Sequence, residues 1–150
     1  MTAPSIDDAE DAASALHLIV AERVAAVAAK DAATLAARQG PAPVVFDVLP
    51  PLQSRSRGEE ESKTRAWFDG YAGTIGYQVR DLTVVGDGTA GFCSFVYHVS
   101  GTLVSGDEVS MWVRATLGVE RVQDRWLIVH DHESVPFDAA TGQALTGLQP

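Results

Sequence analysis

Only one cysteine, Cys93, occurs in the 150 residues, so the chain cannot form an internal disulfide. Cys93 stands between Phe92 and Phe95 in a strand-like stretch. This setting favours a small buried hydrophobic residue over a catalytic thiol, because no activating partner is visible. Positive charge is scarce as well: 11 lysines and arginines against 20 acidic residues give a net charge of -9. Such a chain repels phosphate backbones and anionic lipids, so we expect neither a nucleic acid nor a membrane as partner.

Long apolar runs are also missing. No stretch of the sequence approaches the ~20 apolar residues that a membrane span needs. The first residues, MTAPSIDDAEDAA, are acidic where a secretory signal carries positive charge. We therefore expect a cytoplasmic protein. Its length, with 46% hydrophobic and 21% charged residues, suits one compact domain.

The N-terminal quarter has the pattern of amphipathic helices. Between Ile6 and about Ala37, larger apolar residues recur at the i, i+3, i+4, i+7 spacing of one helix face: Leu16, Ile19, Val20, Val24, Val27 and Leu35. Ser5, which two aspartates follow, is a suitable N-cap. We expect two helices with a break near Lys30 and Asp31, and the second helix stops at Gly40-Pro41.

The rest of the chain changes to a strand pattern. The run 44–48 predicts a short strand that Pro50-Pro51 ends, and a helix is expected from about Glu59 to Tyr71. Apolar residues then alternate with a period of two and predict four strands: Tyr77–Val85, Ala90–Ser100, Val109–Val122 and Arg125–Ser134. Helices followed by an antiparallel meander indicate an α+β domain in which a sheet covers a layer of helices.

This order of elements, together with three short sequence motifs, resembles the nuclear transport factor 2-like superfamily, and most of all its SnoaL-like and SgcJ/EcaC-type ketosteroid isomerase homologues. The motifs are VFDV at 45–48, MWVRAT at 111–116 and WLIVHDHES at 126–134. The last motif is also similar to the association domain of the calcium/calmodulin-dependent kinase. The resemblance spans residues 10–137, which leaves residues 1–9 as a flexible N-terminus and 138–150 as a C-terminal tail.

The resemblance implies an α+β cone with three N-terminal helices packed in the concave face of a curved, mostly antiparallel sheet. It further implies an apolar pocket for a hydrophobic small molecule, a homodimer through the outer sheet face, and no cofactor. Activity does not follow from this fold, because the same architecture supports isomerases, cyclases, dehydratases, hydrolases and non-enzymatic assembly modules.

Asp47 is the first catalytic candidate. An acidic residue inside an apolar strand either points to solvent or is desolvated, and desolvation raises the pKa of a carboxyl toward that of a general base. The resemblance points the same way, because the isomerases carry their proton-shuttling aspartate where Asp47 lies. They also place a tyrosine on the first helix, where this chain has Arg23. Arg23 either clamps an anionic substrate, pairs with Asp47, or lies on the surface.

His130 and His132 lie two residues apart on the last predicted strand. Alternation places them on one face with Trp126, Ile128 and Ser134, and it places Asp131 and Glu133 on the other. If the histidines point inward, they are acid–base partners of Asp47. If the similarity to the kinase domain governs, Asp131 and Glu133 point inward and the histidines join Arg114 on the outer face.

Four further residues complete the candidate site. His98 lies on a polar stripe that faces either a pocket or solvent, and Arg114 belongs with whichever face holds Trp112. Trp67 and Tyr77 are aromatic and suit either packing or a pocket wall. The two histidines of the last strand lack a third ligand at a familiar spacing, so no metal site is expected.

Two hypotheses follow. The first is an enzyme that moves protons on a hydrophobic organic molecule, of the isomerase, cyclase or dehydratase kind, with Asp47 as general base. The second is a non-catalytic binding module or dimeric assembly module. An enzyme is expected to hold a carboxyl group of raised pKa beside a second titratable group, whereas a module is expected to hold hydrocarbon or a satisfied ion pair in its pocket.

Overall fold

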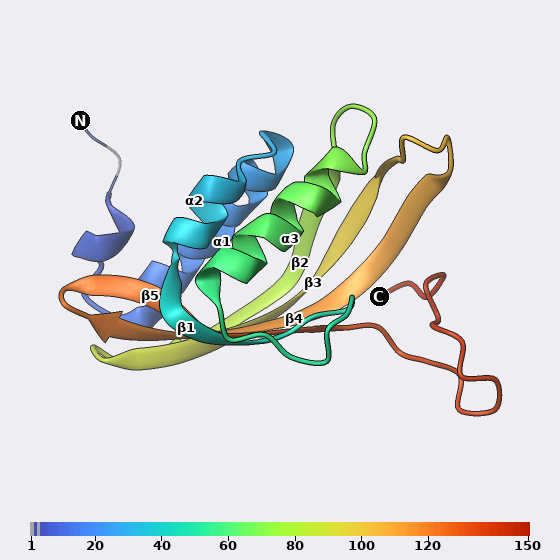
Figure 1. Cartoon of the computed structure of the whole chain (residues 1–150). Helices are drawn as coiled ribbons and strands as arrows, with labels where there is room; N and C mark the ends of the chain where they lie inside the picture. Colours follow the sequence, from blue (N-terminus) through green and yellow to red (C-terminus); the bar gives the residue numbers. More distant parts are fainter. Residues whose placement is uncertain (1, 3) are drawn as a thin grey trace.

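A computed structural model describes residues 2 and 4–150, and in it the helices cover one face of a curved sheet (Figure 1). The elements follow one another along the chain as η1 (Ile6–Asp8), α1 (Ala12–Ala28), α2 (Ala32–Ala37), β1 (Gln39–Phe46), α3 (Arg57–Asp69), β2 (Gly76–Gly86), β3 (Ala90–Thr102), β4 (Glu108–Val122) and β5 (Arg125–Ser134). The expected α+β cone is confirmed. No helix in the described part of the chain is long and apolar enough to cross a membrane.

The sheet has the strand order β1-β5-β4-β3-β2. Neighbouring strands run antiparallel except at one edge, where β1 runs parallel to β5 and pairs Val45 with Asp131. β1 begins earlier than predicted, at Gln39, and its register shifts between Gln39 and Val44. Prolines cannot donate to a ladder and are tolerated at an irregular edge strand, which explains how Pro41 and Pro43 fit here. Because β1 ends at Phe46, Asp47 follows the strand and does not lie inside it as predicted.

Side chains at helix ends set the lengths of the first two helices. The predicted break is confirmed: Lys30 has a positive φ of 53°, and Asp31 caps α2 by accepting a hydrogen bond from the Thr34 N–H at 3.0 Å. The start differs from the prediction, because Ser5 caps only the short turn η1. The N-cap of α1 is Asp11, whose carboxylate accepts from the Ser14 N–H at 2.8 Å.

The core lies between α1 and the concave face of the sheet. Leu16 and Ile19 on the helix pack into one cluster with Val113 and Leu117 on β4. Small residues permit a close approach, since a Cβ added at Gly86 would lie 2.5 Å from the Cβ of Ala12. The alanines of α1 therefore allow the helix to lie directly against the β2–β3 hairpin.

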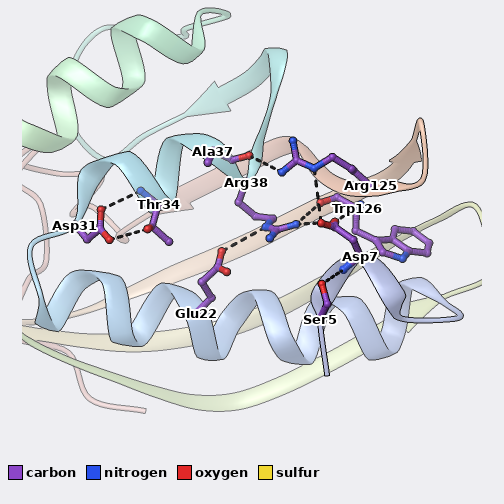
Figure 2. Close-up of polar contacts among 9 residues, drawn as sticks. All are labelled: Ser5, Asp7, Glu22, Asp31, Thr34, Ala37, Arg38, Arg125 and Trp126. Carbon is purple, nitrogen blue, oxygen red and sulfur yellow. Dashed lines mark hydrogen bonds and ion pairs between the residues drawn. The ribbon is translucent and has the colours of Figure 1, made fainter. Parts of the chain in front are cut away.

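The segment that precedes α1 is packed against the start of β5. Asp7 accepts hydrogen bonds from Arg38 Nη1 at 2.9 Å and from the Trp126 N–H at 3.2 Å (Figure 2). The Trp126 indole is fully buried and donates to the carbonyl oxygen of Ala9 at 3.0 Å. The flexible segment predicted over residues 1–9 includes residues 1 and 3, which lie outside the described residues. Within the described part, Ile6 and Ala9 are buried.

These contacts predict that Asp7→Ala destabilises the fold. The change leaves the partly buried Trp126 N–H without an acceptor and removes one carboxylate from Arg38, which together cost about 1–3 kcal/mol of unfolding free energy. Urea denaturation followed by tryptophan fluorescence measures this loss. The matched control is Asp8→Ala, an exposed neighbour that is expected to change stability by less than about 0.5 kcal/mol. Equal effects of the two substitutions would contradict the anchoring role of Asp7.

Candidate functional site

A bulge in β5 decides which of its side chains face the helices. On β4, Val119 pairs with Ile128 and Leu117 pairs with Asp131, so β5 takes three residue steps where β4 takes two. The extra residue reverses the alternation. Ile128 and Asp131 are therefore both buried on the inner side, although they are an odd number of residues apart.

The bulge corrects the predicted grouping of the last strand. His130 and His132 do not share a face with Trp126 and Ile128. The histidines lie on the outer face of the sheet, where His132 pairs with Thr116 and is exposed. The alternative in which Asp131 and Glu133 point toward the helices is the one that the structure adopts.

Arg23 of α1 meets these two inward carboxyl groups. Its Nη2 lies 3.0 Å from Asp131 Oδ2 and 3.2 Å from Glu133 Oε2. The three side chains are largely buried, with exposed fractions of 15%, 4% and 11%. Arg23 thus lies on the inward-facing side of α1. It does not lie on the surface, and it does not pair with Asp47. A buried carboxyl pair needs such a cation, because isolated buried charges are strongly unfavourable.

Two tyrosines complete the buried cluster. The Tyr97 hydroxyl donates to Glu133 Oε1 at 2.6 Å, and the Tyr77 ring stacks on Tyr97 with the ring centroids 4.4 Å apart. Within the described residues, two buried polar atoms of this cluster have no hydrogen-bond partner: Tyr77 Oη and Asp131 Oδ1.

The cluster holds a proton at neutral pH. Burial, together with the charge of Asp131, raises the pKa of Glu133 to about 8 against the opposing charge of Arg23. Burial also raises the pKa of both Tyr77 and Tyr97. Burial lowers the pKa of Arg23, but the charges of Asp131 and its other neighbours outweigh this and raise it. Arg23 thus faces two carboxyl groups, and that of Glu133 keeps its proton at neutral pH.

Asp47 lies near this cluster and is held by α3. Its Oδ2 is 2.9 Å from Lys63 Nζ, and its Oδ1 accepts from the Val48 N–H at 2.6 Å. Lys63 also pairs with the buried Glu60 at 3.1 Å, one helical turn earlier. Burial lowers the pKa of Lys63, but hydrogen bonds and charge from Asp47 and Glu60 outweigh this and raise it.

A pocket of about 600 Å³ opens where β1 and β5 end. Its titratable lining consists of Asp47, His132 and Glu133, and its apolar lining includes Phe46, Val48, Leu52 and Val135. The pocket therefore brings two predicted site residues, Asp47 and His132, together with Glu133. The side chain of Asp47 is 24% exposed, so it is accessible and still fixed by its partners.

The other predicted site residues lie elsewhere. His98 hydrogen-bonds to Ser110 at 2.9 Å, Arg114 donates to Ser134 at 3.2 Å, and His130 donates to the Val44 carbonyl at 2.8 Å, all outside the Arg23 cluster. Trp67 packs on the rings of Phe68 and Tyr71. Among the described residues, no three His, Cys, Asp or Glu side chains gather as metal ligands.

Sequence reasoning missed Lys63, Glu60 and Tyr97. Tyr97 carried a usable signal, because it alternates in step with the buried Phe95 and Val99 and so belongs to the inner face. Glu60 and Lys63 have the i,i+3 spacing of a helical ion pair, but so do many solvated pairs.

The fold and this site define a class of protein: an α+β cone with a small-molecule-sized pocket where β1 and β5 end. The sequence model of the SnoaL-like domain matches residues 18–138, so the chain belongs to the SnoaL-like family. No curated protein matches the sequence.

Solved structures with the same fold have low sequence identity to this chain. A nuclear transport factor 2-like protein of unknown function from Pseudomonas putida is 24% identical, with a TM-score of 0.84 over 93% of this chain and 96% of its own. A candidate calcium/calmodulin-dependent protein kinase II association domain from Xanthomonas campestris is 19% identical, with a TM-score of 0.70 over 97% and 95%. A candidate ketosteroid isomerase from Shewanella frigidimarina is 18% identical, with a TM-score of 0.64 over 85% and 97%.

The proton on Glu133 predicts how stability changes with pH. A carboxyl group whose folded-state pKa is about 8, against a model value of 4.5, binds more protons in the folded state between these values, so stability falls as pH rises from 5 to 8. Glu133→Gln removes this dependence and is expected to raise stability at pH 8 by at least about 1 kcal/mol. Chemical denaturation at pH 5, 6, 7 and 8 measures the slope. The exposed Glu120→Gln is the control, and an unchanged slope in Glu133→Gln would refute the assignment.

Proposed function

We propose that the chain is an enzyme that transfers protons on an apolar organic molecule bound in the pocket beside Asp47 and Glu133. Isomerisation or elimination of water is the reaction class that two such carboxyl groups suit. A base removes a proton at one position, and an acid protonates an oxygen at another. The observation that carries the proposal is that Asp47 and Glu133 both line one pocket, while the side chain of Glu133 is the more deeply buried of the two.

Asp47 is the general base in this proposal. Lys63 and the Val48 N–H hold its carboxylate in one position, 2.9 Å and 2.6 Å away, and its partial exposure leaves oxygen lone pairs open to the pocket. A fixed carboxylate loses little orientational freedom when it accepts a proton from a bound molecule. The apolar walls formed by Phe46, Val48 and Val135 would exclude water from the reacting atoms.

Glu133 is the proton donor. With a pKa of about 8, it retains its proton at pH 7, and Tyr97 orients its carboxyl group. Pairs of titratable groups whose environments differ in this way are typical of acid–base catalysis. His132 lines the same pocket from the outer side and is a further polar contact for a bound molecule.

A non-catalytic module is the second candidate, and two observations favour it. Arg23 already pairs with both buried carboxyl groups, as in a structural ion cluster. The outer face of the sheet carries Trp112, which lies 5.2 Å from the His98 ring and 5.5 Å from the Arg80 guanidinium carbon. Figure 1 shows the helices on the opposite face, so a second copy could pack against this one.

Asp47→Asn tests the enzyme. The probe is 2-tetralone, an apolar ketone with acidic α-hydrogens, and the measurement is hydrogen–deuterium exchange in D2O by NMR. The native protein is expected to accelerate exchange, and Asp47→Asn is expected to lose about 100-fold or more of that acceleration. The exposed Asp69→Asn is the control and is expected to retain it. An Asp47→Asn protein that melts and exchanges like the native one would exclude Asp47 as base.

Trp112→Asp tests the assembly. If the outer face pairs two copies, sedimentation of the native protein gives twice the chain mass of 15.9 kDa, and the substitution gives the single mass because it places a charge in an apolar interface. The control Val104→Asp changes an exposed apolar residue in the turn that follows β3. A monomeric native protein, or a dimer that survives Trp112→Asp, would rule out this interface.

A further inference from the structure

The buried ionisable groups are unequal in number. They form two ion-paired clusters: the largely buried Glu133, Arg23 and Asp131, and Glu60 with the half-buried Lys63 and Asp47. Four carboxyl groups thus face two cations, and the charge of Asp47 acts on Glu133 across the gap between the clusters. The interior carries an excess of negative charge or must hold protons in its place.

This excess of carboxyl groups lies at the pocket. The lining includes Asp47 and Glu133 but neither of their cations, Arg23 and Lys63. A molecule that enters therefore meets hydrogen-bond acceptors and negative charge before it meets either cation. The remaining walls are mostly apolar, with Phe46 on one side.

We propose that this pocket binds apolar molecules that carry one protonated amine, with the ammonium group paired to the carboxyl groups of Glu133 and Asp47. The assignment rests on the proposed function only in using the same pocket, and it names a class of ligand that competes there with the proposed substrate, because its binding removes the proton that Glu133 would donate. One ammonium reduces the charge excess, and charge-assisted hydrogen bonds to carboxylates are the strong ones. An anionic analogue of the same shape meets two carboxyl groups and is rejected.

Binding of the amine releases the proton that Glu133 carries. The groups that face Glu133 are Arg23 from α1, Tyr77 from β2, Tyr97 from β3, Asp131 from β5 and Asp47 after β1. In the free protein, Glu133 is protonated at pH 7, because its pKa is about 8. An ammonium beside it favours the ionised form, so the carboxyl group releases its proton as the amine binds.

Three probes of one shape test the charge preference. Isothermal titration calorimetry at pH 7 compares 1-adamantylamine, 1-adamantanol and adamantane-1-carboxylate. The amine is expected to bind about tenfold more tightly than the alcohol, and the carboxylate about 100-fold more weakly than the amine. Titration of the amine in phosphate and in Tris, which differ in ionisation enthalpy, is expected to show release of nearly one proton per amine bound.

The native protein alone gives a second measurement. Because Glu133 is already ionised above its pKa of about 8, the amine is expected to bind about tenfold more tightly at pH 9 than at pH 7 and to release almost no proton at pH 9. Glu133→Gln is expected to abolish proton release and the preference for the amine while it keeps the affinity for the alcohol. The exposed Glu120→Gln is the control and retains all of these properties.

The inference is overturned if the carboxylate binds as tightly as the amine, if the amine binds without releasing a proton at pH 7, or if none of the three probes binds at millimolar concentration. These outcomes are separate from a failure of catalysis. If the protein prefers the amine but Asp47→Asn leaves proton exchange unchanged, this inference stands and the proposed function is wrong. If the protein does not prefer the amine but proton exchange depends on Asp47, the proposed function stands and this inference is wrong.

Discussion

One extra residue in β5 places two carboxyl groups inside the cone, and the cluster around Arg23 follows from that. The bulge near Val129 keeps Ile128 in the hydrophobic core and turns Asp131 and Glu133 toward α1. Without it, the same strand would present His130 and His132 to the helices. Bulges commonly redirect side chains beside active sites, and here the change is from imidazoles to carboxyl groups.

The carboxyl groups of Asp131 and Glu133 can be buried only because neighbouring groups compensate their negative charges. Arg23 compensates one negative charge, and the retained proton on Glu133 removes the other. Tyr97 then hydrogen-bonds to the carboxyl group that carries the proton. Replacing Arg23 would leave the carboxyl groups without their buried cation, which costs several kcal/mol, so the stability of the cluster depends on this side chain.

Most of the architecture was predictable from the sequence, whereas the chemistry of the interior was only partly so. Alternation and turn residues gave β5 its observed bounds and β4 its bounds to within one residue, because they act locally. Asp47 was predicted as a site residue from its place in the apolar run 44–48, and it lines the pocket just after β1 ends. The bulge was not found, because Val129 is as good a strand former as its neighbours and leaves no mark in composition. The pairing of Lys63 with Asp47 was missed because it depends on where α3 lies against the loop after β1.

The two ends of β5 have different surroundings: the first is packed against the N-terminal segment, and the second borders the pocket. At its start, the buried Trp126 is enclosed by Asp7, Arg38 and the η1 turn (Figure 2). At its finish, about 23 Å farther along for the seven residue steps from Trp126, Glu133 borders an open pocket. A strand anchored at one end holds the groups at the other end in place without covering them. Members of the family share this fold, but the residues at the ends of β1 and β5 determine which molecule the pocket accepts. In this chain these residues include the acidic Asp47 and Glu133.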